Sequence, residues 1–296
     1  MSMRLFIGGM RGSQPAVGAA FDAFGGDTTS LLLVGAQGER LVFDAGTGMQ
    51  AGARELAALE PGSRGETCLA RTVTVLFSHY HLDHLVGLTM NPLFYQPGWS
   101  FKFAGPRLAD ANVRAAVTRL LAPPYWPISW EKMGARFEFV DFDADEIAVG
   151  SLHVRACPVS HPGGCFAYRI DDASGAALVY ATDIEWRDRT PAQEEAFVTL
   201  CTQPKPADLL VIDAHFARAE AEAFAGWGHT CWEDGLDLAR SAGIGRVLLG
   251  HHAPGADDRT LHAVEKEVKE RLPGAALARA GQWWTLEGKS PHADMA

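Results

Sequence analysis

One short segment of the chain, Ser78-His79-Tyr80-His81-Leu82-Asp83-His84, decides the fold. It follows the apolar run 73–77, which is typical of a buried strand. On an extended strand end, side chains two positions apart point to the same side, so His79 and His81 can hold one cation. Where the chain then turns toward a helix, Asp83 and His84 can face a second cation. The segment therefore favours a two-metal site over the alternative, a polar loop whose histidines only cap a helix.

The ligand types indicate which metals to expect. Imidazole and carboxylate suit Zn²⁺, while Mn and Fe ions are alternatives that depend on geometry and supply. Four protein ligands cannot complete two metal shells, so further ligands are expected at the ends of buried strands, where the backbone is fixed. Three strand-like runs end in such a residue: His161, Asp183 and His251. Each alone would more often cap a helix or satisfy a turn, but together, in this order, they favour two divalent metal ions.

Short apolar runs alternate with helical patterns along the chain. The runs predict strands at 31–34, 41–43, 73–77, 137–140, 178–181, 209–212 and 247–249, and another around Val154. Helical spacing predicts helices at 49–59, 107–121, 192–201, 232–242 and 258–272. This alternation is typical of an α/β fold. We expect one domain over residues 1–296, with a polar tail at 288–296.

The composition limits the classes of partner. The chain has 26 Lys and Arg against 36 Asp and Glu, a formal net charge of −10. A protein that binds long nucleic acids needs a basic surface, so these are disfavoured, whereas a small anionic molecule can still bind beside metals. The five cysteines form no C-x-x-C pair, and no apolar run resembles a membrane span or a signal peptide. We therefore expect a soluble, cytoplasmic protein with reduced thiols and no membrane partner.

Several motifs besides the histidine cluster resemble those of one family. They are Met10-Arg11-Gly12-Ser13, Gly25-Gly26-Asp27-Thr28-Thr29-Ser30, Phe43-Asp44-Ala45-Gly46-Thr47-Gly48, Ser160-His161-Pro162, Ala181-Thr182-Asp183, Gly226-Trp227-Gly228-His229-Thr230 and Gly250-His251-His252. With them the sequence resembles the metallo-β-lactamase superfamily, in the branch that contains ribonuclease Z and related phosphodiesterases. The resemblance implies a four-layer αββα sandwich with the site at one edge of the paired sheets.

The resemblance also implies a role for each site residue. One metal would be held by His79, His81 and His161, the other by Asp83, His84 and His251, with Asp183 bridging both. Asp83 and His229 would be the catalytic residues, His229 acting as general acid or oxyanion stabiliser. An imidazole suits this role because its ordinary pKa is about 6.5. The alternative for His229 is a helix-start residue without a catalytic role.

Four residues are candidate substrate contacts. His252 follows the ligand His251, and Trp227 lies in the loop of His229. Tyr125 and Trp126 belong to an aromatic segment that prolines stiffen and that could form a lid over the site. The alternative is that these two rings only pack their loop against the core.

The resemblance favours a phosphodiesterase that acts on a small phosphodiester, of cyclic-nucleotide or phosphonate type. A metal-bridging hydroxide would attack phosphorus, and His229 would protonate the leaving group. From His161 to Asp183 is only 22 positions, which leaves no room for the long transfer-RNA-binding arm of many ribonuclease Z enzymes, so transfer-RNA processing is a weaker alternative. The same residues also fit a carboxylic ester, lactone or thioester hydrolase and, outside enzymes, a non-catalytic metal-binding module. Family habit implies a homodimer.

Overall fold

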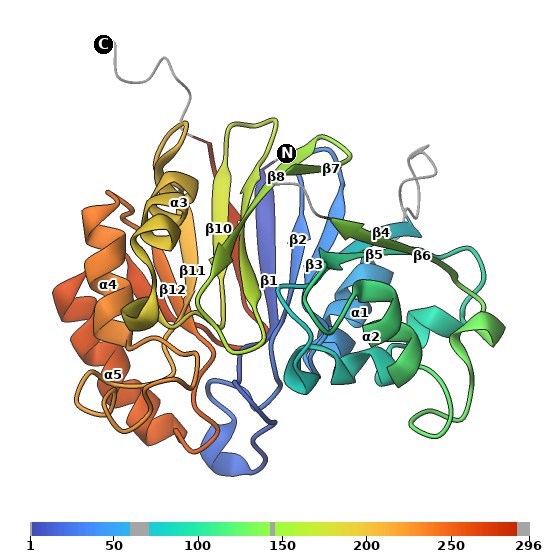
Figure 1. Ribbon diagram of the computed structural model, residues 1–296, viewed down its shortest axis with the longest axis horizontal. Helices are drawn as coiled ribbons and strands as arrows, with labels where there is room; N and C mark the ends of the chain where they lie inside the picture. Colours follow the sequence, from blue (N-terminus) through green and yellow to red (C-terminus); the bar gives the residue numbers. More distant parts are fainter. Residues whose placement is uncertain (1, 60–70, 143–145, 289–296) are drawn as a thin grey trace.

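Two β-sheets face each other in the computed structural model, which describes residues 2–59, 71–142 and 146–288. Within these residues each sheet has seven strands, and helices cover the outer face of each sheet (Figure 1). The four-layer αββα sandwich predicted from the sequence is therefore confirmed.

The first sheet has the strand order β14-β1-β2-β3-β4-β5-β6. Its strands are β1 (Met3–Gly9), β2 (Ser30–Val34), β3 (Arg40–Phe43), β4 (Thr72–Leu76), β5 (Ser100–Pro106), β6 (Arg136–Phe142) and β14 (Trp283–Leu286). Its outer face is covered by α1 (Met49–Ala58) and α2 (Val113–Leu120). The four strands β3 to β6 run parallel to one another.

The second sheet has the order β13-β12-β11-β10-β9-β8-β7. Its strands are β7 (Glu146–Val149), β8 (Leu152–Val159), β9 (Cys165–Asp171), β10 (Ala177–Ala181), β11 (Leu209–Asp213), β12 (Val247–Gly250) and β13 (Ala275–Leu277). Its helices are α3 (Pro191–Thr202), α4 (Trp232–Ser241) and α5 (Asp258–Arg271). Here the four strands β10 to β13 are parallel.

Three apolar clusters hold the layers together. One lies between the two sheets and includes Leu5, Phe43, Tyr168 and Leu248. The other two lie between each sheet and its helices. Because both faces of the central strands are covered, β2, β3, β10, β11 and β12 are buried along their whole length, which explains their unbroken apolar runs.

The seven strands predicted with bounds and four of the five predicted helices lie within two residues of the observed bounds, and the strand expected around Val154 is β8. The helix predicted at 107–121 is wrong at its start, since α2 begins at Val113. Asn112 caps it by accepting a hydrogen bond from the Ala115 amide, and the Val113 amide donates to Asp141. Side-chain acceptors thus fix a start that hydrophobic spacing alone does not locate.

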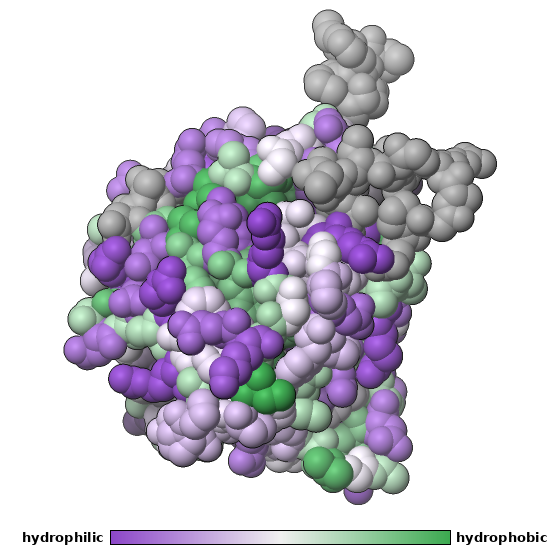
Figure 2. Space-filling view, turned by 90° about the vertical axis from the view of Figure 1, so that its right-hand side faces the viewer, coloured by the Kyte–Doolittle hydropathy of each residue, from purple (hydrophilic) through white to green (hydrophobic). Residues whose placement is uncertain are grey.

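Parallel strands place their carboxyl ends at one edge of a sheet, and residues that follow β4, β8, β10, β11 and β12 gather at that edge. The side of the molecule that carries α1 and α2 is a different, mixed surface, with small hydrophobic patches between hydrophilic residues (Figure 2). None of the helices in the described ranges is long and apolar enough to cross a membrane.

Candidate metal centre

The structure brings all seven predicted ligands together around one carboxylate, that of Asp183. Five histidine ring nitrogens lie within 4.0 Å of its two oxygens. They belong to His79, His84, His161, His229 and His251. Asp183 lies two residues beyond the end of β10, so the buried strand fixes where this carboxylate lies.

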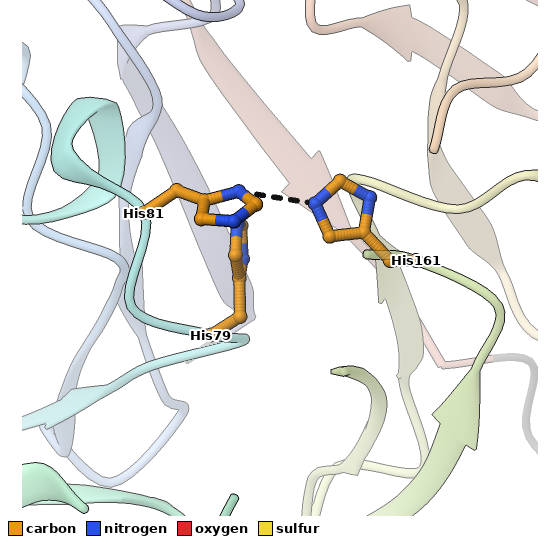
Figure 3. A group of neighbouring side chains, drawn as sticks. All are labelled: His79, His81 and His161. Carbon is orange, nitrogen blue, oxygen red and sulfur yellow. Dashed lines mark hydrogen bonds between the residues drawn. The ribbon is translucent and has the colours of Figure 1, made fainter. Parts of the chain in front are cut away.

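The first group of ligands contains His79, His81 and His161, whose rings point toward one another (Figure 3). His81 Nδ1 lies 3.2 Å from His161 Nε2. His79 and His81 come from the loop after β4 in the first sheet, whereas His161 follows β8 in the second. The group therefore joins the two sheets.

The second group contains Asp83, His84 and His251, together with Asp183. His84 Nε2 lies 3.2 Å from Asp83 Oδ2 and 3.1 Å from Asp183 Oδ2, and His251 Nε2 lies 3.2 Å from Asp183 Oδ1. Asp83 and His84 lie in the short 3-10 helix Leu82–His84, and His251 follows β12. This group also takes ligands from both sheets.

These distances fit metal coordination. Two ligands of a tetrahedral zinc ion, each bound at about 2.0–2.1 Å, lie roughly 3.3 Å apart. The Nε2 atoms of His79, His84 and His251 are buried and have no hydrogen-bond partner among the described residues. Such buried, unpaired nitrogens are costly unless a ligand such as a cation engages them. The two groups thus have the donors, spacing and unpaired atoms to hold two divalent cations.

The backbone is strained at the same place. Ser13, Asp44, Asp183 and His251 have φ values of 61°, 51°, 55° and 56°, a region that non-glycine residues rarely adopt. Two of these residues are predicted ligands, and the Ser13 amide donates to a third, Asp83, over 2.8 Å. Strain of this kind typically persists where a site needs a side chain in one particular position.

The protonation states also suit metal binding. Burial by itself would raise the pKa of Asp183, but the surrounding histidines outweigh it and hold this pKa well below its usual range. Burial lowers the pKa of His79 and of His251, which keeps both rings neutral. Ionised carboxylate and neutral imidazole are the forms that bind metals. His84 differs, because Asp183, Asp83 and Asp44 outweigh burial and raise its pKa well above the ordinary value, so this ring must release a proton when a cation binds.

Asp44 positions one ligand and was not predicted as a site residue. Its buried carboxylate accepts hydrogen bonds from the Ser78 amide and hydroxyl, both at 2.8 Å, and from the Tyr180 hydroxyl at 2.6 Å. One of its oxygens also lies 2.9 Å from His84 Nδ1. Asp44 follows β3 directly, so the strand-end rule that identified Asp183 would have found it.

Replacing Asp44 by asparagine should weaken metal binding by about 10- to 100-fold, the usual cost of losing a residue that orients a metal ligand. Competition with a coloured chelator measures the affinity. Tyr180→Phe is the matched control, because it removes one donor and keeps the carboxylate, and a smaller loss is expected. Equal affinities in Asp44→Asn and the native protein would show that Asp44 serves only the fold.

His229 lies beside both ligand groups and pairs with Asp213. Its Nδ1 is 2.8 Å from Asp213 Oδ2, and its ring stacks on that of His251 with centroids 4.8 Å apart. Asp213 is the last residue of β11, and its other oxygen accepts from the amides of His215 and Thr230. Burial lowers the pKa of His229, but the charge and hydrogen bond of Asp213 outweigh it and raise this pKa to about 9.

His215 is a further histidine at the centre that sequence reasoning missed. Its ring is stacked on His229 with centroids 4.3 Å apart and an interplanar angle of 10°. Its Nδ1 donates to the His251 carbonyl oxygen over 2.8 Å, which leaves Nε2 as the ring atom with a free lone pair. His215 lies two residues beyond the end of β11. The expectation that site residues follow buried strands therefore indicates this region, but it does not assign a role to His215.

Glu185 holds the loop that carries His229. Its carboxylate accepts hydrogen bonds from the amides of Gly226, at 2.7 Å, and Gly228, at 2.8 Å. The Gly228 carbonyl in turn accepts a hydrogen bond from His161 Nδ1 over 2.9 Å. The other ring nitrogen of His161, Nε2, therefore faces the other ligands. Gly228 has a φ of 88°, and a Cβ there would lie 2.2 Å from His161 Nδ1, so only glycine fits.

Replacing Glu185 by glutamine should lower turnover by about tenfold or more and weaken metal retention together. Glutamine offers one acceptor to two amides, and a lost hydrogen bond to a charged group typically costs about 1.5–3 kcal/mol. Turnover and metal content are measured on the same preparation. Glu194→Gln, which changes an exposed carboxylate on α3, is the control. Native turnover and metal content in Glu185→Gln would contradict the proposed clamp.

The four predicted substrate contacts differ in their positions. Trp227 is exposed, two residues before His229, and its ring meets Phe224 edge-on at 5.1 Å. His252 is buried, and its Nε2 donates to the Ala278 carbonyl at 2.8 Å. His252 therefore has one ring nitrogen engaged by the backbone, and it lines a cavity beside the metal centre, so its role as a substrate contact stays a prediction.

The aromatic segment at 123–130 also lies elsewhere than predicted. Trp126 packs against the apolar cluster between the first sheet and its helices, and its indole nitrogen donates to the Tyr95 hydroxyl over 2.7 Å. Tyr125 is exposed beside it. The structure does not bring these rings to the histidine cluster. The second interpretation, in which they pack their loop onto the core, describes Trp126.

Comparisons with known proteins agree with this fold. Residues 39–252 match the family described as "Beta-lactamase superfamily domain". A ribonuclease Z from Synechococcus sp. (strain WH7803) is 26% identical over 73% of this chain and 80% of its own length. Among solved structures, the metallo-β-lactamase-fold protein YhfI from Bacillus subtilis is 20% identical, with a TM-score of 0.64 over 96% of this chain and all of its own. A diphosphatase of the PhnP family has a TM-score of 0.66 at 15% identity, over 97% of this chain and all of its own.

Proposed function

This chain belongs to the metallo-β-lactamase superfamily and is a hydrolase of that fold, and on this premise we propose that it hydrolyses a small phosphodiester. The cofactors would be two divalent cations, zinc in the first place. The first would be held by His79, His81, His161 and Asp183, the second by Asp83, His84, His251 and Asp183. When bound, such a pair of cations activates water and stabilises charge on attacking and leaving oxygens.

The paired side chains of His229 and Asp213 carry the proposal. Asp213 accepts a hydrogen bond from Nδ1, so Nε2 is the nitrogen that can give a proton to a leaving alkoxide. Asp213 also keeps the ring protonated near neutrality, since it raises the pKa of His229 to about 9 against the effect of burial. A phosphodiester with an alkoxide leaving group needs such an acid.

The charge of the centre favours an anionic substrate. Asp44, Asp83 and Asp183 supply three negative charges and metal-bound neutral histidines none, so two divalent cations would still leave the centre net positive. Asp213 and protonated His229 compensate each other. A small phosphodiester, which carries one negative charge, is attracted to such a centre, while a neutral lactone or thioester gains less from it.

A substrate panel with the metal-loaded protein tests the proposal. We expect hydrolysis of bis(p-nitrophenyl) phosphate and of cyclic nucleotides, and much slower turnover of lactones and thioesters. Turnover of lactones alone would contradict a phosphodiesterase and favour a hydrolase of carbonyl substrates. Full metal occupancy without hydrolysis of any member would favour a non-catalytic metal-binding protein.

Transfer RNA is a weaker candidate substrate, although the Synechococcus relative is named ribonuclease Z. The net charge of −10 disfavours a long polyanion, because phosphate-backbone contacts need basic residues. The 22 positions from His161 to Asp183 also leave little chain for an RNA-binding arm. We therefore propose a small substrate.

A further inference from the structure

A cavity of about 360 Å³ lies next to the metal centre. The loop after β11, the first residue of α4 and one face of α5 line it. Its apolar wall includes Phe216, Phe224, Trp232, Leu261, Val264 and Leu277. Protein interiors are normally close-packed, and cavities of this size with apolar walls are typical of ligand sites.

One side chain, His215, belongs both to the cavity wall and to the metal centre. It lines the cavity, and its ring is stacked on that of His229. A Cβ built on Gly12 would lie 2.6 Å from His251 Nε2 and 2.8 Å from His215 Cε1. The Cε1 edge of His215 therefore faces the same small space as the unpaired nitrogen of His251. A single imidazole, that of His215, therefore contacts both the metal centre and the cavity.

The cavity wall also holds an unsatisfied donor. Trp232 lines the cavity, and its indole N–H is buried without a hydrogen-bond partner in the described part of the chain. Buried donors are normally paired, because an unpaired one loses its bond to water. A ligand with an oxygen acceptor would supply the missing partner.

We propose that this cavity binds an apolar arm of the substrate, an aryl or alkyl ester group whose scissile bond lies at the metal centre. The inference rests on the proposed function and narrows its substrate class to diesters with one apolar arm. The stacked rings of Phe216 and Phe224, with centroids 4.3 Å apart, form an aromatic wall for it. Trp227, which contacts Phe224, extends this wall to the surface.

A homologous series of alkyl p-nitrophenyl phosphodiesters, from methyl to hexyl, tests the proposal. Each added methylene that leaves water should raise kcat/KM by about fourfold until the cavity is full. Val264→Phe fills the cavity and should flatten this dependence on chain length. Ala263→Phe, an exposed neighbour on α5 outside the cavity wall, should keep it. A flat series in the native protein would overturn the proposal.

Binding of 4-butylphenol, measured by calorimetry on metal-free protein, separates this inference from the proposed function. The native protein and Ala263→Phe should bind the probe, and Val264→Phe should bind it at least tenfold more weakly. If no phosphodiester is hydrolysed, the proposed function fails. The same series of chain lengths, made in the substrate class that is hydrolysed, then shows whether the cavity binds an apolar arm of the substrate. Absence of probe binding, or binding without any chain-length dependence of turnover, would overturn the substrate-arm assignment.

Discussion

Replacing Asp183 by asparagine is expected to reduce bound metal from the two ions per chain that we propose to one or fewer. The Asp183 carboxylate lies within 4.0 Å of five histidine nitrogens and is the member shared by both ligand groups. A neutral amide removes its negative charge and one of its two acceptor oxygens. Turnover should fall by more than the roughly 10²-fold that losing a mere partner of a ligand can cost.

Mass-spectrometric metal analysis after gel filtration, combined with turnover, measures this effect. Asp188→Asn is the matched control, because this exposed carboxylate lies five residues further along the chain and contacts Ser160 instead. It should retain two metals and native turnover. Two tightly bound ions in Asp183→Asn would show that Asp183 does not bridge the two groups.

Replacing His229 by alanine should lower turnover by about 10²- to 10⁴-fold while the metal content stays unchanged. The loss should depend on the leaving group. An alkoxide needs the proton that His229 gives, whereas p-nitrophenolate leaves readily without it. A mixed alkyl and aryl substrate series therefore distinguishes a general acid from a residue that only shapes the site. Loss of metal from this variant would show that His229 is a ligand.

The pH dependence follows from the pairing of His229 with Asp213. The acid role requires protonated His229, so activity is present below its pKa, which Asp213 raises, and is lost as the pH rises through that pKa. Asp213→Asn removes the charge that raises the pKa, so the alkaline limb of kcat should move to lower pH. Profiles with an alkyl leaving group measure it. An unmoved limb would contradict the pairing.

The fold and the clustering of the predicted ligands could be predicted because their signals are local. Histidines and aspartates that could bind a metal stand shortly after apolar runs in the sequence. The same rule would have found Asp44 and Asp213, which stand at the ends of β3 and β11. What each of them contacts depends on the tertiary fold, since Asp44 lies beside His84 and Asp213 pairs with His229.

Other features depend on contacts between distant loops and leave no such signal. Glu185 acts through the amides of Gly226 and Gly228, some 40 residues away, and no spacing rule relates them. Trp126 was predicted as a substrate contact because of the aromatic residues next to it in the sequence. Its hydrogen-bond partner Tyr95 lies 31 positions earlier and holds Trp126 beside the helices of the first sheet. The role of His215 likewise depends on its stacking with His229.

The hydrogen bond from His161 to the Gly228 carbonyl couples the metal centre to the loop of His229. The carbonyl fixes a ligand of the first group, His161, while its own loop carries Trp227 and His229. A substrate that shifts this loop therefore shifts the orientation of a metal ligand as well. Thermodynamic reciprocity then requires that the metal changes the affinity for substrate by the same factor by which the substrate changes the affinity for metal. Cation and substrate would then act as mutual effectors, each changing the affinity of the protein for the other by the same factor.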